Sequence, residues 1–276
     1  MKTPVALSLF FAIAMLASGP LAIATEDESS APGQPFPETP VQVRDTAAIA
    51  AAIASPDRPK ADVERDPVAK PRELLAFLGV TPGMRVIDMF AAGGYYTELL
   101  ARTVGVKGQV IAYNNPPYAR FAEKGIAQRY ADGRLGNVRQ VTAEVDELQL
   151  APASLDAALF VMGFHDAYWR PADGSWNRTD PDELLRRLHG ALKPGAVVVV
   201  QDHVASPGGD TAKVVDQLHR IDPAVVRAAF ERAGFVFDKA SEILARPEDD
   251  HSKLVFDESI RGRTDQFIYR FRKPTP

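Results

Sequence analysis

The sequence of 276 residues contains no cysteine. It can therefore form no disulfide bond and can offer no thiol as a nucleophile or metal ligand. It also lacks a run of basic residues, and its formal net charge is −4. Proteins that bind nucleic acid usually carry clustered positive charge, so we expect a small-molecule substrate and no nucleic acid partner. Histidine is scarce, with five in the chain.

The N-terminus has the pattern of a signal peptide. Lys2 precedes an uncharged apolar run over Val5–Ala17, Gly19-Pro20 interrupts it, and Ala22-Ile23-Ala24 is typical of a signal-peptidase site. We predict a signal peptide over residues 1–24 and a secreted, periplasmic protein without stable membrane insertion. No cysteine follows the apolar run, which excludes lipoprotein anchoring, and no twin arginine precedes it. The alternative is an uncleaved N-terminal anchor.

The remainder of the chain divides by composition into a spacer, two helices and one large domain. Residues 25–44 are rich in Pro, Ser, Glu and Gly and are predicted to be a flexible spacer. Residues 45–80 are predicted to contain N-terminal helices over Asp45–Ala54 and Pro71–Leu78. These helices either cover the ligand crevice or pack on the sheet. Residues 81–276 form the main domain.

Apolar runs alternate with helical stretches in this domain, which is typical of an α/β fold with a parallel sheet. We predict seven strands: Arg85–Met89, Gln109–Asn114, Val138–Thr142, Leu155–Gly163, Ala196–Gln201, Val236–Ile243 and Asp265–Arg272. Helices are expected between them, including one over Tyr118–Tyr130. The last strand alternates apolar and polar residues, which indicates one buried face. The fold is thus predicted to be α/β and doubly wound, mostly parallel, with an antiparallel last strand.

The stretch Val86–Ala101 organises this domain. A strand ending in Asp88 passes the turn Gly93-Gly94 and enters an amphipathic helix. Such a turn exposes backbone N–H groups and the positive end of a helix dipole to a ligand. A nucleotide-like ligand is expected there.

These residues resemble a known family, the class I S-adenosylmethionine-dependent methyltransferases, and within it a branch of exported bacterial proteins. The likeness covers residues 68–274. Its landmarks are Pro82–Asp88, Gly93-Gly94, Leu155-Asp156, Leu192–Gly195, Leu218–Pro223 and Arg261–Phe267. The resemblance implies a Rossmann-like methyltransferase sheet of seven strands and S-adenosyl-L-methionine as cofactor.

Two positions depart from the family pattern. The usual Gly-x-Gly-x-Gly reads Phe90-Ala91-Ala92-Gly93-Gly94 here, so only its third glycine is in place. The acid that closes the second strand and binds the ribose is replaced by Asn114, which can accept one hydrogen bond and donate another. The resemblance implies the cofactor-binding residues Asp88, Ala92, Gly93, Gly94, Asn114 and Glu144.

Polar residues follow the fourth and fifth strands, at the sheet edge where α/β proteins bind ligands. His165 is predicted as general base, with Asp166 or Asp202 orienting it. The predicted catalytic set is His165, Asp166, Asp202 and His203, and a purely structural role is the alternative for each histidine. Asp166, Asp202 and His203 could hold a divalent ion, but Mg²⁺ prefers oxygen ligands. No metal is predicted.

Other residues are predicted to contact substrate. Tyr168 and Trp169 could form an aromatic wall for a planar molecule, and His219 and Arg220 could reach into the crevice to meet an anion. Asp249–His251 resembles a ligand cluster but is expected to be a solvated loop.

The sequence therefore predicts methyl transfer from S-adenosyl-L-methionine to an O or N of a small molecule. The alternative is an exported, non-catalytic protein that binds a small molecule or nucleoside on the same fold. A nicotinamide-dependent oxidoreductase is a third and poorer hypothesis, because Gly-x-Gly-x-x-Gly is absent and Asn114 replaces the acid that binds ribose.

Overall fold

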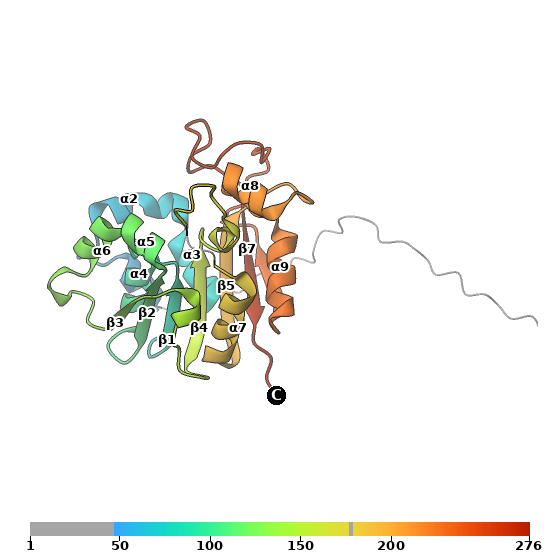
Figure 1. The fold of residues 1–276 in the computed structure, drawn as a ribbon. Helices are drawn as coiled ribbons and strands as arrows, with labels where there is room; N and C mark the ends of the chain where they lie inside the picture. Colours follow the sequence, from blue (N-terminus) through green and yellow to red (C-terminus); the bar gives the residue numbers. More distant parts are fainter. Residues whose placement is uncertain (1–46, 177–178) are drawn as a thin grey trace, which may run out of the picture. The chain divides into compact units, whose positions relative to one another are not determined.

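A computed structural model describes residues 47–176 and 179–276 (Figure 1). The predicted signal peptide over residues 1–24, the predicted spacer over 25–44 and Asp45 lie outside the described residues. Among the helices of the described ranges, none is both long and apolar enough to cross a membrane.

The described residues form a seven-stranded sheet of order β3-β2-β1-β4-β5-β7-β6. The strands are β1 (Arg85–Met89), β2 (Gln109–Asn114), β3 (Val138–Thr142), β4 (Leu155–Val161), β5 (Leu192–His203), β6 (Val236–Ser241) and β7 (Gln266–Arg272). Strands β1 to β5 pair in parallel, and β7 lies antiparallel between β5 and β6. The predicted fold class is confirmed. The first three strands have their predicted bounds.

Two layers of helices cover the sheet (Figure 1). The helices are α1 (Ala47–Ile53), α2 (Lys60–Ala69), α3 (Pro71–Leu78), α4 (Tyr95–Val104), α5 (Pro116–Phe121), α6 (Glu123–Arg129), α7 (Pro181–Ala191), α8 (Thr211–Leu218) and α9 (Pro223–Arg232). One core contains α1, α3 and α4, and the other contains α7 and α9. Along β1, Val86 faces the first core and Ile87 the second, as the two-residue period of a strand requires. Helices α1 and α3 thus pack on the sheet.

Several elements differ from the predictions. Strand β4 ends at Val161 rather than Gly163, because Met162 takes a left-handed φ of 52°. The helix expected over Tyr118–Tyr130 is two helices, α5 and α6, which meet at Ala122. Helix α5 begins at Pro116, two residues before the predicted start, because the Asn115 side chain caps it by accepting a hydrogen bond from the Tyr118 N–H at 2.9 Å.

Helices α2 and α8 were not predicted at all. Helix α2 has almost no amphipathic pattern and contains Pro67, so the helical period that marks a buried face is missing. Tertiary contacts stabilise it instead: Arg58 makes a bidentate ion pair with Asp66 at 2.7 Å. Asp66 also accepts a hydrogen bond from the Tyr95 hydroxyl at 2.6 Å, which joins α2 to α4. This places α2 beside the loop that follows β1.

Candidate active site

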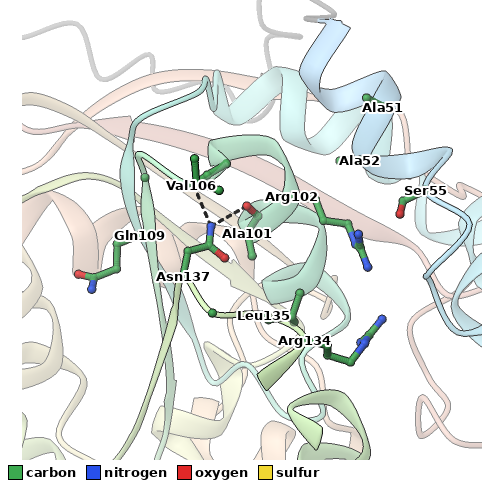
Figure 2. Close-up of a pocket in the computed structure, with 13 residues that line it drawn as sticks. Ala51, Ala52, Ser55, Ala101, Arg102, Val106, Gln109, Arg134, Leu135 and Asn137 are labelled. Atoms are coloured by element: carbon green, nitrogen blue, oxygen red, sulfur yellow. Dashed lines mark hydrogen bonds between the residues drawn. The ribbon is translucent and has the colours of Figure 1, made fainter. Parts of the chain in front are cut away.

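A cavity of about 770 Å³ lies at the amino ends of β2 and β3 (Figure 2). Its charged side chains are Arg102 and Arg134, and both pair with Glu98. Ligands of open α/β sheets bind at the opposite edge, outside the carboxyl ends of the strands. A ligand site is therefore expected at the carboxyl ends of β1, β4 and β5.

The loop after β1 has left-handed backbone at alternate positions, with φ of 55° at Phe90, 47° at Ala92 and 81° at Gly94. This conformation costs a residue other than glycine roughly 1–2 kcal/mol. The loop therefore follows a path suited to glycine even where Phe90 and Ala92 replace the glycines of the family pattern. A Cβ at Gly94 would lie 2.7 Å from the Tyr130 hydroxyl, so any side chain there would require Tyr130 to move.

Asn114, at the end of β2, holds this loop through the main chain of Ala92. Its Oδ1 accepts a hydrogen bond from the Ala92 N–H at 2.8 Å, and its Nδ2 donates to the Ala92 carbonyl at 3.2 Å. The amide is buried and both of its polar groups are engaged within the protein. One lone pair of Oδ1 and one hydrogen of Nδ2 remain, so the predicted contact of Asn114 with a ribose stays a prediction.

Asp88 lies beside the loop in a cavity of about 220 Å³, here called the loop cavity. Its walls come from β1, from Phe90–Gly94, from the start of α4 and from α2 and α6. Asp88 is 3% exposed, and its Oδ2 accepts a hydrogen bond from the Thr97 hydroxyl at 2.5 Å. Burial raises the pKa of Asp88 to about 7. Gly93 and Gly94 line the same cavity, so the structure brings these three predicted residues together.

An ion-pair network that the sequence analysis missed surrounds the loop cavity. Arg129 of α6 donates to the Gly93 carbonyl at 2.9 Å and pairs with Asp62 of α2 and with Glu98 of α4. Glu98 is fully buried, and although burial raises its pKa, the arginines Arg134, Arg129 and Arg102 lower it further than burial raises it. The network joins α2, α4 and α6 around the loop.

Another cavity, of about 390 Å³ and here called the aromatic cavity, adjoins the loop cavity. The two share Arg65, Phe90, Ala92 and Val161 as lining residues. Most of the remaining wall is apolar and aromatic: Tyr118, Phe121, Met162, Trp169, Trp176, Val255 and Phe256. Its polar side chains are His165, Asp166, His203 and His219.

His165 lies at the centre of these polar groups, at the start of the short 3₁₀ segment His165–Tyr168 after β4. Its Nδ1 is 2.7 Å from Asp202 Oδ1, and its main-chain N–H donates to Asp202 Oδ2 at 3.0 Å. On the other side, His165 Nε2 is 3.4 Å from Asp166 Oδ1. Burial lowers the pKa of His165, but the two carboxylates outweigh burial and raise it to about 9. The predicted grouping of His165, Asp166 and Asp202 is present.

His203 follows Asp202 at the end of β5 and faces the same cavity. Its Nδ1 is 2.8 Å from the Thr264 hydroxyl, and its main-chain N–H donates to Asp202 at 2.8 Å. Burial lowers the pKa of His203 to about 4. This imidazole is therefore neutral at pH 7, unlike His165.

Of the predicted substrate residues, Trp169 and His219 line the aromatic cavity and touch each other, with ring centroids 4.9 Å apart. Tyr168 instead packs against the core beside Phe164. The expectation that Arg220 reaches into the crevice is wrong, because Arg220 is 0% exposed and paired with Asp249 at 2.9 Å.

Asp249 and Glu144 also differ from expectation. Asp249 was expected in a solvated loop, but the pair with Arg220 buries it. Glu144 lines neither the loop cavity nor the aromatic cavity. It precedes the short 3₁₀ segment Val145–Glu147, near the Tyr113 ring.

The sequence analysis also missed side chains of the aromatic cavity. Tyr118 donates a hydrogen bond to Asp166 Oδ2 at 2.5 Å, and its ring stacks on Phe90 with centroids 5.2 Å apart. Trp176 packs against both Tyr118 and Trp169. No local pattern marks these residues, since an aromatic residue in a helix or loop is typical of any core.

The chain matches no family model. It is similar to the ubiquinone/menaquinone biosynthesis C-methyltransferase UbiE of Idiomarina loihiensis, with 26% identity over 189 residues, covering 68% of this chain and 63% of the relative. The same enzyme of Shewanella putrefaciens is 24% identical over 196 residues, covering 71% of this chain and 66% of the relative. The relatives in sequence are thus methyltransferases, and the chain spans about two thirds of their length or slightly less.

Solved structures share the fold at lower identity. A SAM dependent methyltransferase from Aquifex aeolicus has 19% identity and a TM-score of 0.54, covering 76% of this chain and 93% of that chain. Phosphoethanolamine N-methyltransferase 2 of Haemonchus contortus, in complex with S-adenosyl-L-methionine, has 13% identity and a TM-score of 0.55, covering 83% of this chain and 60% of that chain. The [4+2]-cyclase SpnF has 18% identity and a TM-score of 0.52, covering 78% of this chain and 82% of that chain.

Proposed function

Since the chain has the fold of class I S-adenosylmethionine-dependent methyltransferases, we propose that it transfers a methyl group to a small molecule. The observation that carries this proposal is the shared wall between the loop cavity and the aromatic cavity. Methyl transfer requires donor and acceptor in contact and in line. Two adjoining cavities, one beside the glycine turn and one lined by aromatic side chains, fit that requirement.

The residues of the loop cavity fit the amino acid part of S-adenosyl-L-methionine. Asp88 offers a buried carboxylate to an ammonium group, and the first turn of α4 offers N–H groups to a carboxylate. Asn114 makes one hydrogen bond with each of its polar groups to Ala92, so at most one acceptor position and one donor hydrogen remain for the ribose. When bound, the cofactor would supply an electrophilic methyl group on a sulfonium.

The acceptor is proposed to be a planar small molecule. Aromatic side chains bind planar rings by stacking and edge contacts, and Trp169, Trp176 and Phe256 line the cavity. The relatives in sequence are named for ubiquinone and menaquinone biosynthesis, so a ring compound is compatible with both observations. Methylation of an O or N on that ring is the proposed reaction.

His165 is the candidate base for the acceptor's proton. Asp202 holds its Nδ1, which leaves Nε2 for the cavity. With a pKa of about 9, roughly one imidazole in a hundred is unprotonated at pH 7. Proximity and orientation in the cavity therefore contribute more to the rate than proton removal does.

A second candidate is a binding protein that performs no methyl transfer. The Asn114 contacts to Ala92 favour it, since they engage part of a side chain that would otherwise bind the ribose. The fold alone does not decide between the two, because function depends on the site and one neighbour of the same fold is named a cyclase.

We also propose that the protein acts after export, on the basis of residues 1–24. The mass of the protein recovered from a periplasmic extract tests this proposal. Cleavage after Ala24 supports it, and an uncleaved chain in the cytoplasmic fraction contradicts it.

Calorimetric titration with S-adenosylhomocysteine tests the leading candidate. Binding should occur below about 1 mM and should weaken in Asp88→Ala, while Asp238→Ala, which alters a carboxylate far from the loop cavity, should bind as the unaltered protein does. If neither S-adenosylhomocysteine nor S-adenosyl-L-methionine binds at that concentration, the methyltransferase proposal fails. A different ligand recovered from the purified protein by native mass spectrometry would then favour the binding protein.

A further inference from the structure

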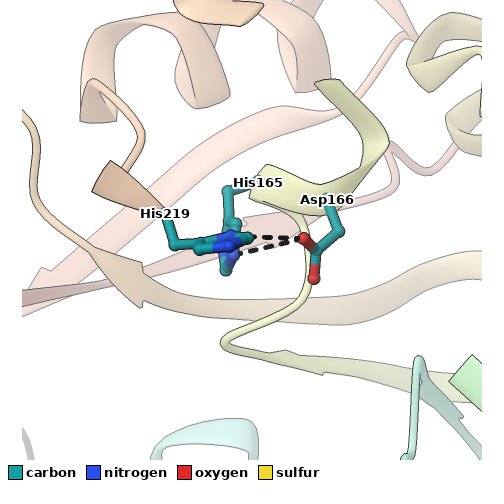
Figure 3. Close-up of side chains that lie close together, drawn as sticks. All are labelled: His165, Asp166 and His219. Atoms are coloured by element: carbon teal, nitrogen blue, oxygen red, sulfur yellow. Dashed lines mark ion pairs between the residues drawn. The ribbon is translucent and has the colours of Figure 1, made fainter. Parts of the chain in front are cut away.

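Three metal-ligating side chains meet on the wall of the aromatic cavity: His165, Asp166 and His219 (Figure 3). One ligand atom from each lies within 4.8 Å of the other two. We propose that these three side chains hold one divalent transition-metal ion whose remaining coordination positions open into the cavity.

The distances suit a metal centre after a small adjustment. Asp166 Oδ1 lies 3.4 Å from His165 Nε2 and 3.9 Å from His219 Nδ1. An ion with bonds of about 2.1 Å in tetrahedral geometry keeps its ligand atoms roughly 3.4 Å apart. The first pair has that spacing already, and the second reaches it when the His219 ring moves by roughly 0.5 Å. The third pair, between the two histidine nitrogens, is no more than 4.8 Å apart, and the same ring movement has to close it.

Hydrogen bonds to other residues leave one ligand atom of His165 and one of Asp166 available for the ion. Asp202 takes the Nδ1 of His165, so Nε2 is the nitrogen that remains. Histidines that bind metals commonly have a carboxylate on the other ring nitrogen, as here. The Tyr118 hydroxyl donates to Asp166 Oδ2, so Oδ1 is the oxygen that remains between the two histidines.

Rings on both sides hold the His219 imidazole in place. The Trp169 ring lies 4.9 Å away and the Phe256 ring 5.2 Å away, measured between centroids. His219 also has a left-handed φ of 49° at the end of α8. The side chain is therefore directed at Asp166 rather than into solvent.

The charge of the cluster favours a cation. Asp166 and Asp202 are both buried, and within the part of the chain that the structure describes their ion-pair partners are histidines, not lysine or arginine. Buried carboxylates without a fixed positive charge are costly. A divalent ion between Asp166 and the two imidazoles would replace the proton on His165 and would place two positive charges against the two carboxylates.

The donor set indicates the class of metal. Two imidazole nitrogens and one carboxylate oxygen suit Zn²⁺, Fe²⁺, Co²⁺ and Mn²⁺, whereas Mg²⁺ and Ca²⁺ prefer oxygen throughout. Three protein ligands with open positions are typical of catalytic rather than structural sites. The ion would hold an acceptor atom in the aromatic cavity, and His165, whose Nε2 the ion would occupy, would then not act as the base. This use of the ion, unlike its binding, rests on the proposed function.

The test is titration of the chelator-treated, purified protein with Co²⁺ and Zn²⁺, followed by calorimetry and by the visible spectrum of bound Co²⁺. We expect one ion per chain. Asp166→Asn keeps the bond to Tyr118 and removes the charge, and His219→Phe keeps a ring against Trp169 and Phe256 and removes the nitrogen. Each should weaken binding by roughly 100-fold or more, and Asp202→Asn by about 10- to 100-fold.

His189→Ala is the matched control, because His189, in the last turn of α7, packs against Phe235 and does not line the aromatic cavity. It should bind the ion as the unaltered protein does. Circular dichroism selects the variants that fold. Less than one ion per chain in the unaltered protein, or equal affinity in the folded Asp166→Asn and His219→Phe variants, overturns the proposal. S-adenosylhomocysteine binding, measured on the same preparation, separates this outcome from failure of the proposed function.

Discussion

Asn114 and Ala92 form a two-bond contact in which one side-chain amide satisfies both main-chain groups of one loop residue, at 2.8 and 3.2 Å. Ala92 is one of the two residues other than glycine that take left-handed backbone in this loop. Asn114, which replaces the expected acid, therefore holds the main chain of Ala92, which replaces an expected glycine. The two departures from the family pattern compensate each other physically.

The first prediction concerns this contact. Asn114→Ala leaves the N–H and the carbonyl of Ala92 without their partner, and the free energy of unfolding should fall by about 1–3 kcal/mol. Urea denaturation measures the change. Gln140→Ala, at an exposed position of the neighbouring strand β3, is the control and should stay within about 0.5 kcal/mol of the unaltered protein. Equal values for the two variants would show that the contact contributes nothing.

A second prediction concerns the backbone at Ala92. Ala92→Gly removes the Cβ that makes a φ of 47° unfavourable, so stability should rise by up to about 1 kcal/mol despite the greater freedom of glycine in the unfolded chain. Ala91→Gly is the matched control, because Ala91 has no positive φ. It should lower stability by about 0.5–1 kcal/mol. The same sign for both substitutions in thermal melts would contradict the role given to the Ala92 backbone.

The third prediction is a pH dependence from Asp88. Burial raises its pKa from 3.8 to about 7, so the folded protein retains a proton that the unfolded chain has lost between those values. The contribution of Asp88 to the free energy of unfolding is fully present below about pH 4 and is lost as the pH rises to about 7. The loss amounts to roughly 4 kcal/mol.

The difference in unfolding free energy between the unaltered protein and Asp88→Asn isolates this effect. Asn cannot titrate, so the difference should become steadily less favourable to the unaltered protein from pH 4 to pH 7. A difference that stays constant over this range would mean that Asp88 titrates near its ordinary value.

The fourth prediction separates structure from substrate binding at Arg220. Arg220→Ala leaves Asp249 buried without its partner, and stability should fall by about 3–5 kcal/mol. Arg227→Ala, which breaks an exposed pair with Glu231 on α9, should change stability by less than about 1 kcal/mol. Denaturation curves measure both. A stable Arg220→Ala protein would restore Arg220 as a candidate for contact with substrate.

Much of the fold could be predicted from local pattern. The apolar runs and turns located seven strands, and β1, β2 and β3 have the predicted bounds. Helix α2 could not be found this way, because an ion pair with Arg129 and a hydrogen bond from Tyr95, both remote in sequence, hold it in place rather than an apolar stripe. The site was likewise predicted only in part. The strand ends identified His165, Asp166 and Asp202. Arg220 was wrongly assigned to the crevice, because its partner Asp249 is remote in sequence.

The sequence by itself determined the doubly wound sheet and the glycine turn, because periodic burial and turn chemistry are properties of neighbouring residues. It also determined that polar groups gather at the ends of β4 and β5, since parallel strands bring their carboxyl ends to one edge. Only the tertiary structure decided which atoms meet there. His219 lies opposite His165, and Asn114 bonds to Ala92, because such contacts depend on side-chain directions that elements far apart in the chain impose on one another.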